Sequence, residues 1–196
     1  MESGILECYV LGNSTPQETE LVEQMAASST DVVDEIKAIT EALHQYALAN
    51  GVAPDPLVKP FLLATIDYTD RLKSGESPTF PPVLHPGSIM ADFVPWLNRP
   101  DMAAPVVLHD FYAKIIGYTA QATTAIAWIK DRAPEEVHTT EHEKFLILEG
   151  TCNITVEQDV YSLVAGDYFE IPLFKKHQVI VTSSIACKVI LQRLAA

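Results

Sequence analysis

The chain has 196 residues, of which 48% are hydrophobic and 20% charged, and its formal net charge is −13. This composition is typical of a folded globular protein and excludes wholesale disorder. The acidic balance argues against direct binding of nucleic acid, because phosphate recognition needs the opposite sign of charge.

The front of the chain is predicted to be helical. Apolar residues recur at helical spacing over 5–10, and the segment stops at Gly12. Thr15, Pro16 and Glu18 then predict a strong helix start. Proline has no N–H to leave unpaired at the first helical position, and glutamate can reach back to the capping threonine.

Two further amphipathic helices are predicted. The first follows a polar break at 28–31 and ends at Asn50-Gly51, a pair suited to a left-handed C-cap. The second begins at Asp55-Pro56 and ends at Ser74-Gly75. Four short helices make only a small core, so we expect them to pack on one another or in the groove of a partner.

The negative charge is concentrated in this helical part. Residues 1–76 contain 13 acidic residues and four basic ones, a net charge of −9, whereas the other 120 residues have a net charge of −4. Such an acidic module either serves solubility or attracts a basic protein surface.

The chain changes character after the helices. The proline-rich segment 76–104 is predicted to be a linker and the approach to the next domain. Short β-type runs then recur over 105–196, which is typical of an antiparallel β-sandwich or β-barrel: VVLHDFYAKIIGY, TTAIAWIKD, KFLILEG, CNITVEQ, VYSLVAG, YFEIP, HQVIVTSS and ACKVILQRL. The sequence therefore predicts an α+β protein, with a small helical bundle at 1–75, a linker and a β-barrel.

The three cysteines, Cys8, Cys152 and Cys187, are scattered along the chain. They suit neither a disulfide framework nor a Cys-x-x-Cys metal site, and they indicate a reducing compartment. No apolar run approaches the ~18 residues needed to span a bilayer, and the acidic N-terminus lacks the basic start of a signal peptide. We therefore expect a cytoplasmic protein without a membrane segment.

Histidine and glutamate side chains cluster in two segments of the predicted barrel, 136–150 and 166–177. Residues two apart share a strand face, so Glu136 and His138 can point into a barrel together, joined by Glu143 and by His177 from a later strand. Two imidazoles and two carboxylates suit Zn, Mn, Fe or Ni in mixed coordination. His142 points opposite to Glu143 and is expected outside or at the rim. The alternative is a metal-free barrel whose charged residues line a wet cavity.

These residues resemble the first motif of the cupin superfamily, written G(X)5HXH(X)3–4E(X)6G. The run EKFLILEG at 143–150 matches its last portion, and His138 stands at the second histidine. Glu136 occupies the position of the first histidine, so one ligand has changed. The resemblance covers roughly residues 105 to 195 and implies a double-stranded β-helix.

The second cupin motif, G(X)5PXG(X)2H(X)3N, is matched by Gly166, Pro172 and His177. Phe174 replaces its second glycine and Val181 replaces its asparagine. Taken with the first motif, this resemblance implies a metal site formed by the four residues named above.

The front half resembles the N-terminal helical module of bacterial anti-sigma factors, in the stretch LECYVLGNSTPQETELVEQMAAS. Zinc-binding members carry HxxxCxxC at the end of the second helix. Here Met25, Ser29 and Val32 hold those positions, so the zinc ligands are absent and we expect apolar packing alone to hold the domain. A helical module followed by a single cupin is the layout of the ChrR-like anti-sigma factors.

The resemblance implies that the helices clamp an ECF-type sigma factor and that the cupin binds a metal or small-molecule signal. It favours a regulator over an enzyme. The competing hypothesis is a metal-dependent cupin enzyme, such as a dioxygenase, isomerase or lyase, with the helices used to form a homodimer. A third alternative is a protein that only binds a small ligand.

Overall fold

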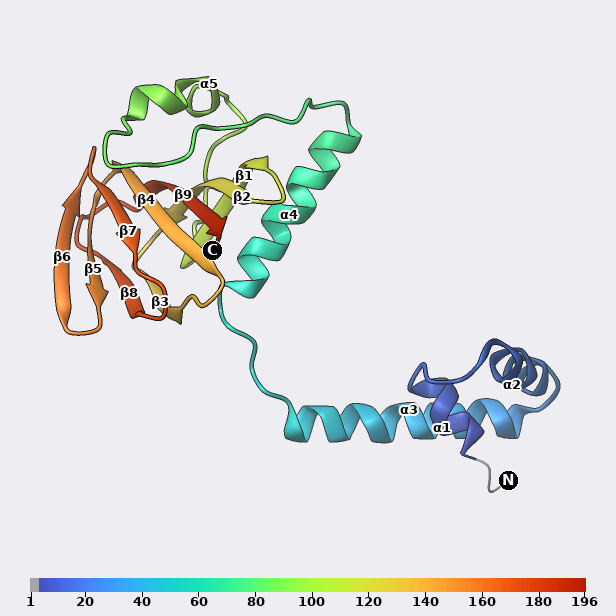
Figure 1. Cartoon of the computed structure of the whole chain (residues 1–196). Helices are drawn as coiled ribbons and strands as arrows, with labels where there is room; N and C mark the ends of the chain where they lie inside the picture. Colours follow the sequence, from blue (N-terminus) through green and yellow to red (C-terminus); the bar gives the residue numbers. More distant parts are fainter. Residues whose placement is uncertain (1–3) are drawn as a thin grey trace. The chain divides into compact units, whose positions relative to one another are not determined.

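A computed structural model of the chain describes residues 4–196 and divides the protein into two compact units, Met1–Pro54 and Asp55–Ala196. The first is helical, and the second is built mainly from antiparallel β-strands (Figure 1). The predicted α+β fold is therefore confirmed. No helix within residues 4–196 combines the length and the hydropathy that crossing a bilayer requires.

The helical unit contains α1 (Ile5–Val10), α2 (Pro16–Ser28) and α3 (Thr30–Asn50). The predicted start of α2 is confirmed as a capping box. Glu18 N donates to Thr15 Oγ1 at 3.3 Å, and Thr15 N donates to Glu18 Oε2 at 2.8 Å. Two N–H groups that the helix cannot pair internally are thereby satisfied.

The core of the helical unit is small. One buried side chain from each helix forms it: Leu6, Val22 and Val32. Met25 packs against this cluster from α2, and Ser29 lies between α2 and α3. Met25 and Val32 thus both contribute to an apolar core.

The predicted left-handed C-cap at Gly51 is wrong, because the residue has φ −65° and ψ 137°. A Cβ atom built at Gly51 would lie 2.8 Å from the carbonyl oxygen of Ala47. The glycine therefore permits a close approach of the backbone and does not supply a positive φ.

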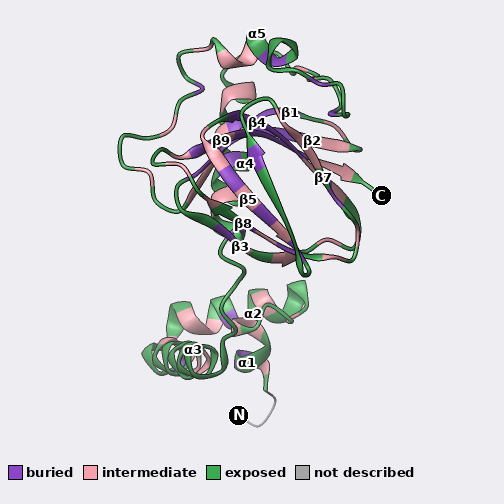
Figure 2. Cartoon of the chain, turned by 90° about the vertical axis from the view of Figure 1, so that its left-hand side faces the viewer, coloured by how far each residue is buried: buried purple, intermediate pink, exposed green. Residues whose placement is uncertain are grey.

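Within residues 4–196, nine strands form two antiparallel sheets that face each other across a shared core (Figure 2). The five-stranded sheet has the order β1 (Phe111–Tyr118), β2 (Ala122–Ile129), β9 (Cys187–Ala195), β4 (Glu141–Glu149) and β7 (Tyr168–Ile171). The four-stranded sheet has the order β3 (Arg132–Val137), β8 (Lys176–Val181), β5 (Thr151–Val156) and β6 (Asp159–Val164). Cys152 and Cys187 are buried free thiols, and Cys8 is exposed.

Strand β3 was absent from the predicted runs. Its sequence, RAPEEV, contains a proline and two adjacent glutamates, so it shows no apolar alternation. It pairs with β8, and the register shifts between Ala133 and Glu136. Pairing with a neighbour, which no local pattern encodes, makes this segment a strand.

Helix α4 (Val58–Lys73) belongs to the barrel unit, although it was predicted to be part of a helical domain ending at residue 75. Its buried Ala64 and Tyr68 join the core between the sheets. Arg71 donates a hydrogen bond to the carbonyl of Ile115 on β1, the edge strand of its sheet. The helix therefore covers an edge that would otherwise be open.

The segment predicted to be a linker at 76–104 packs on the barrel and contains the short helices η1 (Met90–Phe93) and α5 (Val94–Leu97). Fully buried Leu84 and Phe93 contact the outer face of the five-stranded sheet. Gln192 on β9 accepts a hydrogen bond from Leu84 N at 2.7 Å and donates to the carbonyl of Pro82 at 2.9 Å. The prolines predict an extended or turning segment, but they do not reveal whether such a segment packs on a sheet.

Glu76 joins the end of α4 to this segment. Its carboxylate binds Arg99 at 2.6 Å and Arg71 at 2.7 Å. The hydrogen bond from Arg99 is the main cause that lowers the pKa of Glu76 to about 2, with burial opposing it and Arg71 assisting. The ion pairs are therefore present above the ordinary glutamate pKa near 4.5 and are lost as the pH falls toward 2.

We expect Glu76→Gln to lower the melting temperature of the barrel unit by about 3–6 °C at pH 6, because charge-assisted hydrogen bonds are lost. The difference from the wild type should shrink at pH 3, where the wild-type carboxylate begins to be protonated. Calorimetric melting at both pH values measures this. Glu135→Gln, which removes an exposed ion pair to Lys176, is the matched control and should have a small effect. An equal difference at the two pH values would contradict the assignment.

Candidate metal centre

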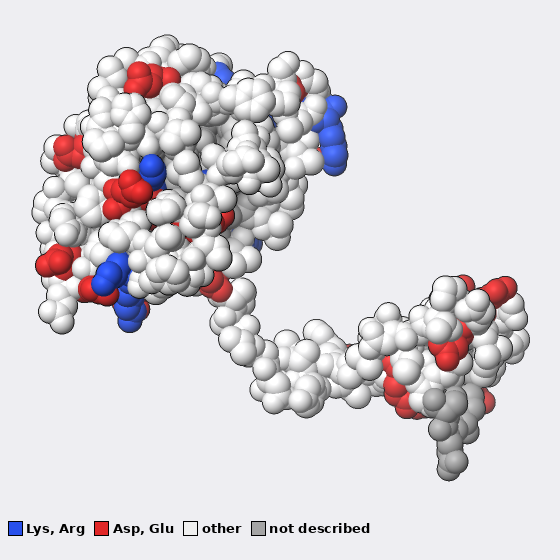
Figure 3. Space-filling view, viewed as in Figure 1, with Lys and Arg blue, Asp and Glu red and all other residues white. Residues whose placement is uncertain are grey.

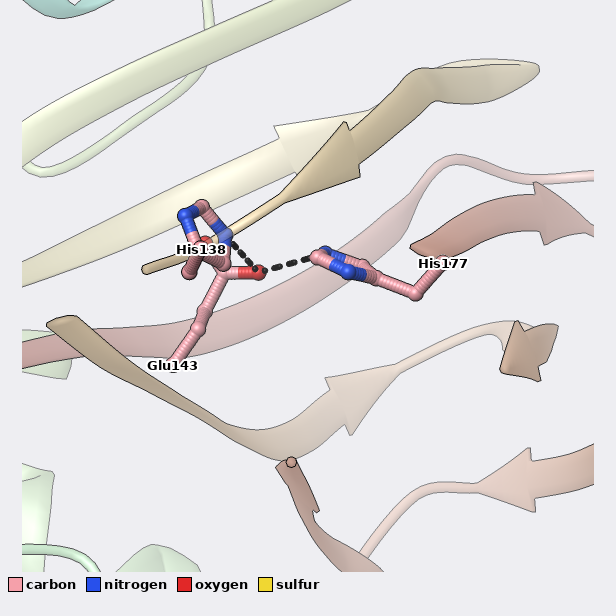
Figure 4. Close-up of side chains that lie close together, drawn as sticks. All are labelled: His138, Glu143 and His177. Carbon is pink, nitrogen blue, oxygen red and sulfur yellow. Dashed lines mark hydrogen bonds and ion pairs between the residues drawn. The ribbon is translucent and has the colours of Figure 1, made fainter. Parts of the chain in front are cut away.

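Three strands place the predicted site residues together between the sheets. Glu143 lies on β4 and His177 on β8. Glu136 lies on β3, and His138 is the first residue after that strand. The β3–β8 register pairs Glu136 with His177. Figure 4 shows the side chains of His138, Glu143 and His177 converging on one another.

The backbone around His138 is held by the loop before β8. Phe174 N donates to the carbonyl oxygen of His138 at 2.8 Å. Phe174 has φ 60°, a conformation that favours glycine, and it occupies the position where the second motif of the cupin superfamily has glycine. The chain thus keeps the left-handed turn that positions His138, although it carries an unfavourable residue there.

One carboxylate oxygen lies between the two imidazoles. Glu143 Oε2 is 3.2 Å from His138 Nε2 and 3.2 Å from His177 Nε2. Glu136 Oε2 is 3.8 Å from His138 Nε2. Glu143 and His177 are almost fully buried, with 3% of each residue exposed. Water therefore screens these charges poorly, so the charged groups interact strongly with one another.

Hydrogen bonding fixes how His177 presents its ring. Its Nδ1 lies 3.2 Å from the carbonyl oxygen of Lys175, which can only accept, so this bond requires a proton on Nδ1. In the neutral ring Nε2 then carries a lone pair directed at Glu143 Oε2. Two electron-rich atoms at 3.2 Å need a cation between them, either a proton on Nε2 or a metal ion.

His138 Nε2 provides a second indication that a cation fits this group. It is buried and has no hydrogen-bond partner within the described chain, although Glu143 Oε2 is near. Buried polar atoms without a partner are uncommon and need an explanation. Ligand atoms of His138, Glu143 and His177 all lie within 4.8 Å of one another. These residues therefore fit a divalent ion held by two imidazoles and one carboxylate.

The pKa values in the site follow from burial and charge. Burial raises the pKa of Glu136, and the neighbouring charge of Glu143 raises it further. Burial alone would raise the pKa of Glu143, but the two imidazoles and Arg193 hold it well below its ordinary value. Burial alone would lower the pKa of His177, yet the hydrogen bond to Glu143 raises it. The site therefore favours a cation beside an ionised Glu143.

Sequence reasoning missed Arg193 on β9. Its Nε donates to Glu143 Oε1 at 3.0 Å, and its Nη2 donates to Glu136 Oε2 at 3.2 Å. An arginine in the strand run ACKVILQRL, on the same face as buried Leu191, was the signal available. Glu136 therefore lies next to the three converging residues, and its carboxylate forms an ion pair with Arg193.

His142 is placed outside the group, as the strand alternation predicted. Its Nδ1 lies 3.5 Å from Glu170 Oε1, and its side chain is 38% exposed. A small cavity of about 10 Å³ lies beside the group and is lined among others by Leu57, Glu143 and His177. A volume of this size holds one water molecule or one ion.

Comparison with known proteins identifies the strand-rich part. Residues 129–192 match the cupin domain family, so the chain contains a C-terminal cupin domain. No curated protein matches the chain in sequence.

Several solved structures are similar to the barrel. The cupin domain of Cnp3 from Schizosaccharomyces pombe has 12% identity and a TM-score of 0.43, and the match covers 47% of this chain and 71% of that chain. KdgF from Halomonas sp. has 15% identity and a TM-score of 0.43, with 49% and 92% covered. A cupin-2 domain containing protein from Shewanella frigidimarina has 18% identity and a TM-score of 0.41, with 45% and 85% covered.

Proposed function

We propose that the protein is an anti-sigma factor of the cytoplasm. Its acidic helices sequester an ECF-type sigma factor, and its cupin domain binds a divalent metal ion as the signal. The proposal joins the resemblance of the N-terminal helices to anti-sigma modules with the His138–Glu143–His177 group of the barrel.

The observation that carries the proposal is the surface of the helical unit. Residues 4–54 contain eight acidic residues and one basic residue, Lys37, and Figure 3 shows acidic groups gathered on the face in view. A groove of about 280 Å³ beside α1 combines apolar Ile5 and Ile39 with acidic Glu7, Asp31 and Glu35. Apolar walls with an acidic rim suit a basic amphipathic helix of a partner.

The small core of this unit supports the same proposal. Only three of its hydrophobic side chains within residues 4–54 are buried, whereas Leu21, Tyr46 and Leu48 are about half exposed or more. A unit with so little buried apolar surface is marginally stable alone, and a partner that covers it would add stability.

In the cupin domain, His138, Glu143 and His177 would hold the ion. A bound divalent cation supplies the positive charge that the converging lone pairs lack. His177 is oriented by its hydrogen bond to the Lys175 carbonyl, and the Phe174–His138 bond holds the second imidazole in place.

A cupin domain is compatible with an enzyme as well as with a regulator. A catalytic cupin must place an organic substrate next to its metal. The cavity at the site has a volume of only about 10 Å³, which is far below the several hundred Å³ of a small-molecule pocket. We therefore prefer the regulator.

Co-expression of the full chain with the ECF sigma factors of the same genome tests the proposal. We expect one of them to co-purify as a stable complex that no longer binds core RNA polymerase. Addition or removal of Zn²⁺ should change the affinity of that complex by roughly 5- to 150-fold, the range of ordinary coupling between sites. Failure of every such sigma factor to bind, with or without metal, would count against the proposal.

A further inference from the structure

Arg193 contacts both the candidate metal ligands and helix α4. Its guanidinium neutralises Glu143 and Glu136 at 3.0 and 3.2 Å. On its other side, Arg193 Cζ lies 4.3 Å from the ring centroid of Phe61, which belongs to α4. A cation at this distance from an aromatic face is attracted to it. One side chain thus joins the site to a helix on the barrel surface.

The guanidinium and a divalent ion compete for the same negative charge. Glu136 and Glu143 together carry two negative charges when ionised, and Arg193 is the cation that pairs with both. A divalent ion at Glu143 Oε2 would repel the guanidinium across a poorly screened distance. It would also attract the Glu136 carboxylate, whose Oε2 is only 3.8 Å from His138 Nε2.

The structure offers Arg193 another position. A cavity of about 170 Å³ beside the guanidinium is lined by Phe61 and Thr65 of α4, by Arg193 itself and by Glu141. Glu141 precedes Glu143 by two residues on β4, so the two carboxylates share one face of the strand. The cavity has room for the guanidinium head, and a carboxylate at its wall can pair with it.

The amino-terminal half of α4 is the part that such a movement affects. Leu57, directly before α4, lines the small cavity beside Glu143 and His177, and Phe61 also packs on Phe111 with ring centroids 5.4 Å apart. The other half is held independently, by Arg71 on Ile115 and by a 3.3 Å ion pair between Lys114 and Asp67. Loss of the Arg193–Phe61 contact would therefore loosen residues 58–65 while the helix stays docked.

We infer that Arg193 is a relay between the metal site and α4. When no metal is bound, Arg193 pairs with the carboxylates of Glu136 and Glu143. When a divalent ion binds, Arg193 moves toward Glu141 and loses its contact with Phe61. This inference rests on the metal-sensing half of the proposed function. Exposed Leu62, Leu63 and Ile66 on α4 then form the surface whose mobility responds to metal.

The first test compares Zn²⁺ affinities of the full-length protein by isothermal titration calorimetry. Arg193→Gln removes the competing cation, so Zn²⁺ should bind about tenfold more tightly or more. Lys188→Gln is a matched control on the same strand. Lys188 also pairs with a carboxylate, Glu149, at 3.0 Å and lies 5.7 Å from the ring centroid of Trp128. It should leave the Zn²⁺ affinity within about twofold of the wild type, since the charge of Lys188 is already paired with Glu149 and lies five residues from Arg193 along β9.

The second test measures hydrogen exchange of α4 with and without Zn²⁺. In the wild type, Zn²⁺ should accelerate exchange over residues 58–65 by about three- to tenfold, the effect of losing one cation–π contact. Arg193→Gln should exchange fast in both conditions. Phe61→Leu keeps every charge of the site but removes the contact that Zn²⁺ binding would break. It should therefore bind Zn²⁺ about two- to tenfold more tightly, because coupling is reciprocal, and lose the exchange response.

The relay would be overturned by unchanged Zn²⁺ affinity in Arg193→Gln, or by a persistent exchange response in Phe61→Leu. Neither result would contradict the metal site itself. If Arg193→Gln does not fold, the Phe61→Leu result alone decides. Absence of Zn²⁺ binding by the wild type would overturn the relay and the metal-sensing half of the proposed function together. Capture of a sigma factor is measured separately and fails or succeeds independently.

Discussion

Glu143→Gln is expected to weaken Zn²⁺ binding by about 100-fold or more. Glu143 Oε2 is the atom that lies 3.2 Å from both His138 Nε2 and His177 Nε2. Glutamine keeps the shape of the side chain but removes its charge, so the two imidazoles lose their anionic partner. Loss of a residue that only supports a metal ligand typically costs 10- to 100-fold in affinity, and loss of a ligand itself costs more.

Metal content of protein purified without nickel chromatography, followed by Zn²⁺ titration, measures the effect. Glu170→Gln is the matched control, because Glu170 also lies beside a histidine, His142, but at the exposed surface. It should bind Zn²⁺ like the wild type. Equal metal content in both variants would show that the ion, if any, is held elsewhere. His177→Ala should behave like Glu143→Gln, since the imidazole that faces the same oxygen is lost.

Much of this site could be predicted from spacing. His138, Glu143 and His177 were predicted together because strand alternation and the cupin-like motifs assign them to one interior, and the structure brings them within ligand distance of one another. The partner of Glu136 could not be predicted. Arg193 lies on β9 of the five-stranded sheet and Glu136 on β3 of the four-stranded sheet, so their pairing depends on how the two sheets pack face to face. A single sequence contains no information on this packing.

The same limit explains why α4 was predicted to belong to the helical domain and not to the barrel unit. An apolar stripe on α4 predicts that one face is buried, but not whether it packs on other helices or on a sheet edge. Tyr68 and Ala64 pack into the barrel, so the helix belongs with the strands. Local signals were accurate where the partners are local, as in the capping box of Thr15 and Glu18. They predicted no contact where the partner is more than a hundred residues away, as for Leu84 and Gln192.

Val22→Asp is expected to unfold the helical unit and abolish capture of the sigma factor. Val22 has no exposed surface and is one of three buried side chains in this core. Burial of an unpaired carboxylate costs several kcal/mol, which is comparable with the ~3–5 kcal/mol that a unit of this size can be expected to have. We therefore expect lower helicity by circular dichroism, rapid proteolysis within residues 4–54 and no complex.

Val52→Asp provides the control for this variant, because it makes the same substitution at a residue that is 93% exposed. It should keep the helicity and the complex. The barrel is the internal control in both proteins. Since it forms a separate compact unit that begins at Asp55, its Zn²⁺ affinity should be the same in Val22→Asp as in the wild type. A Val22→Asp protein that still captured the sigma factor would place the binding surface outside the folded helices, and the clamp proposed for them would be wrong.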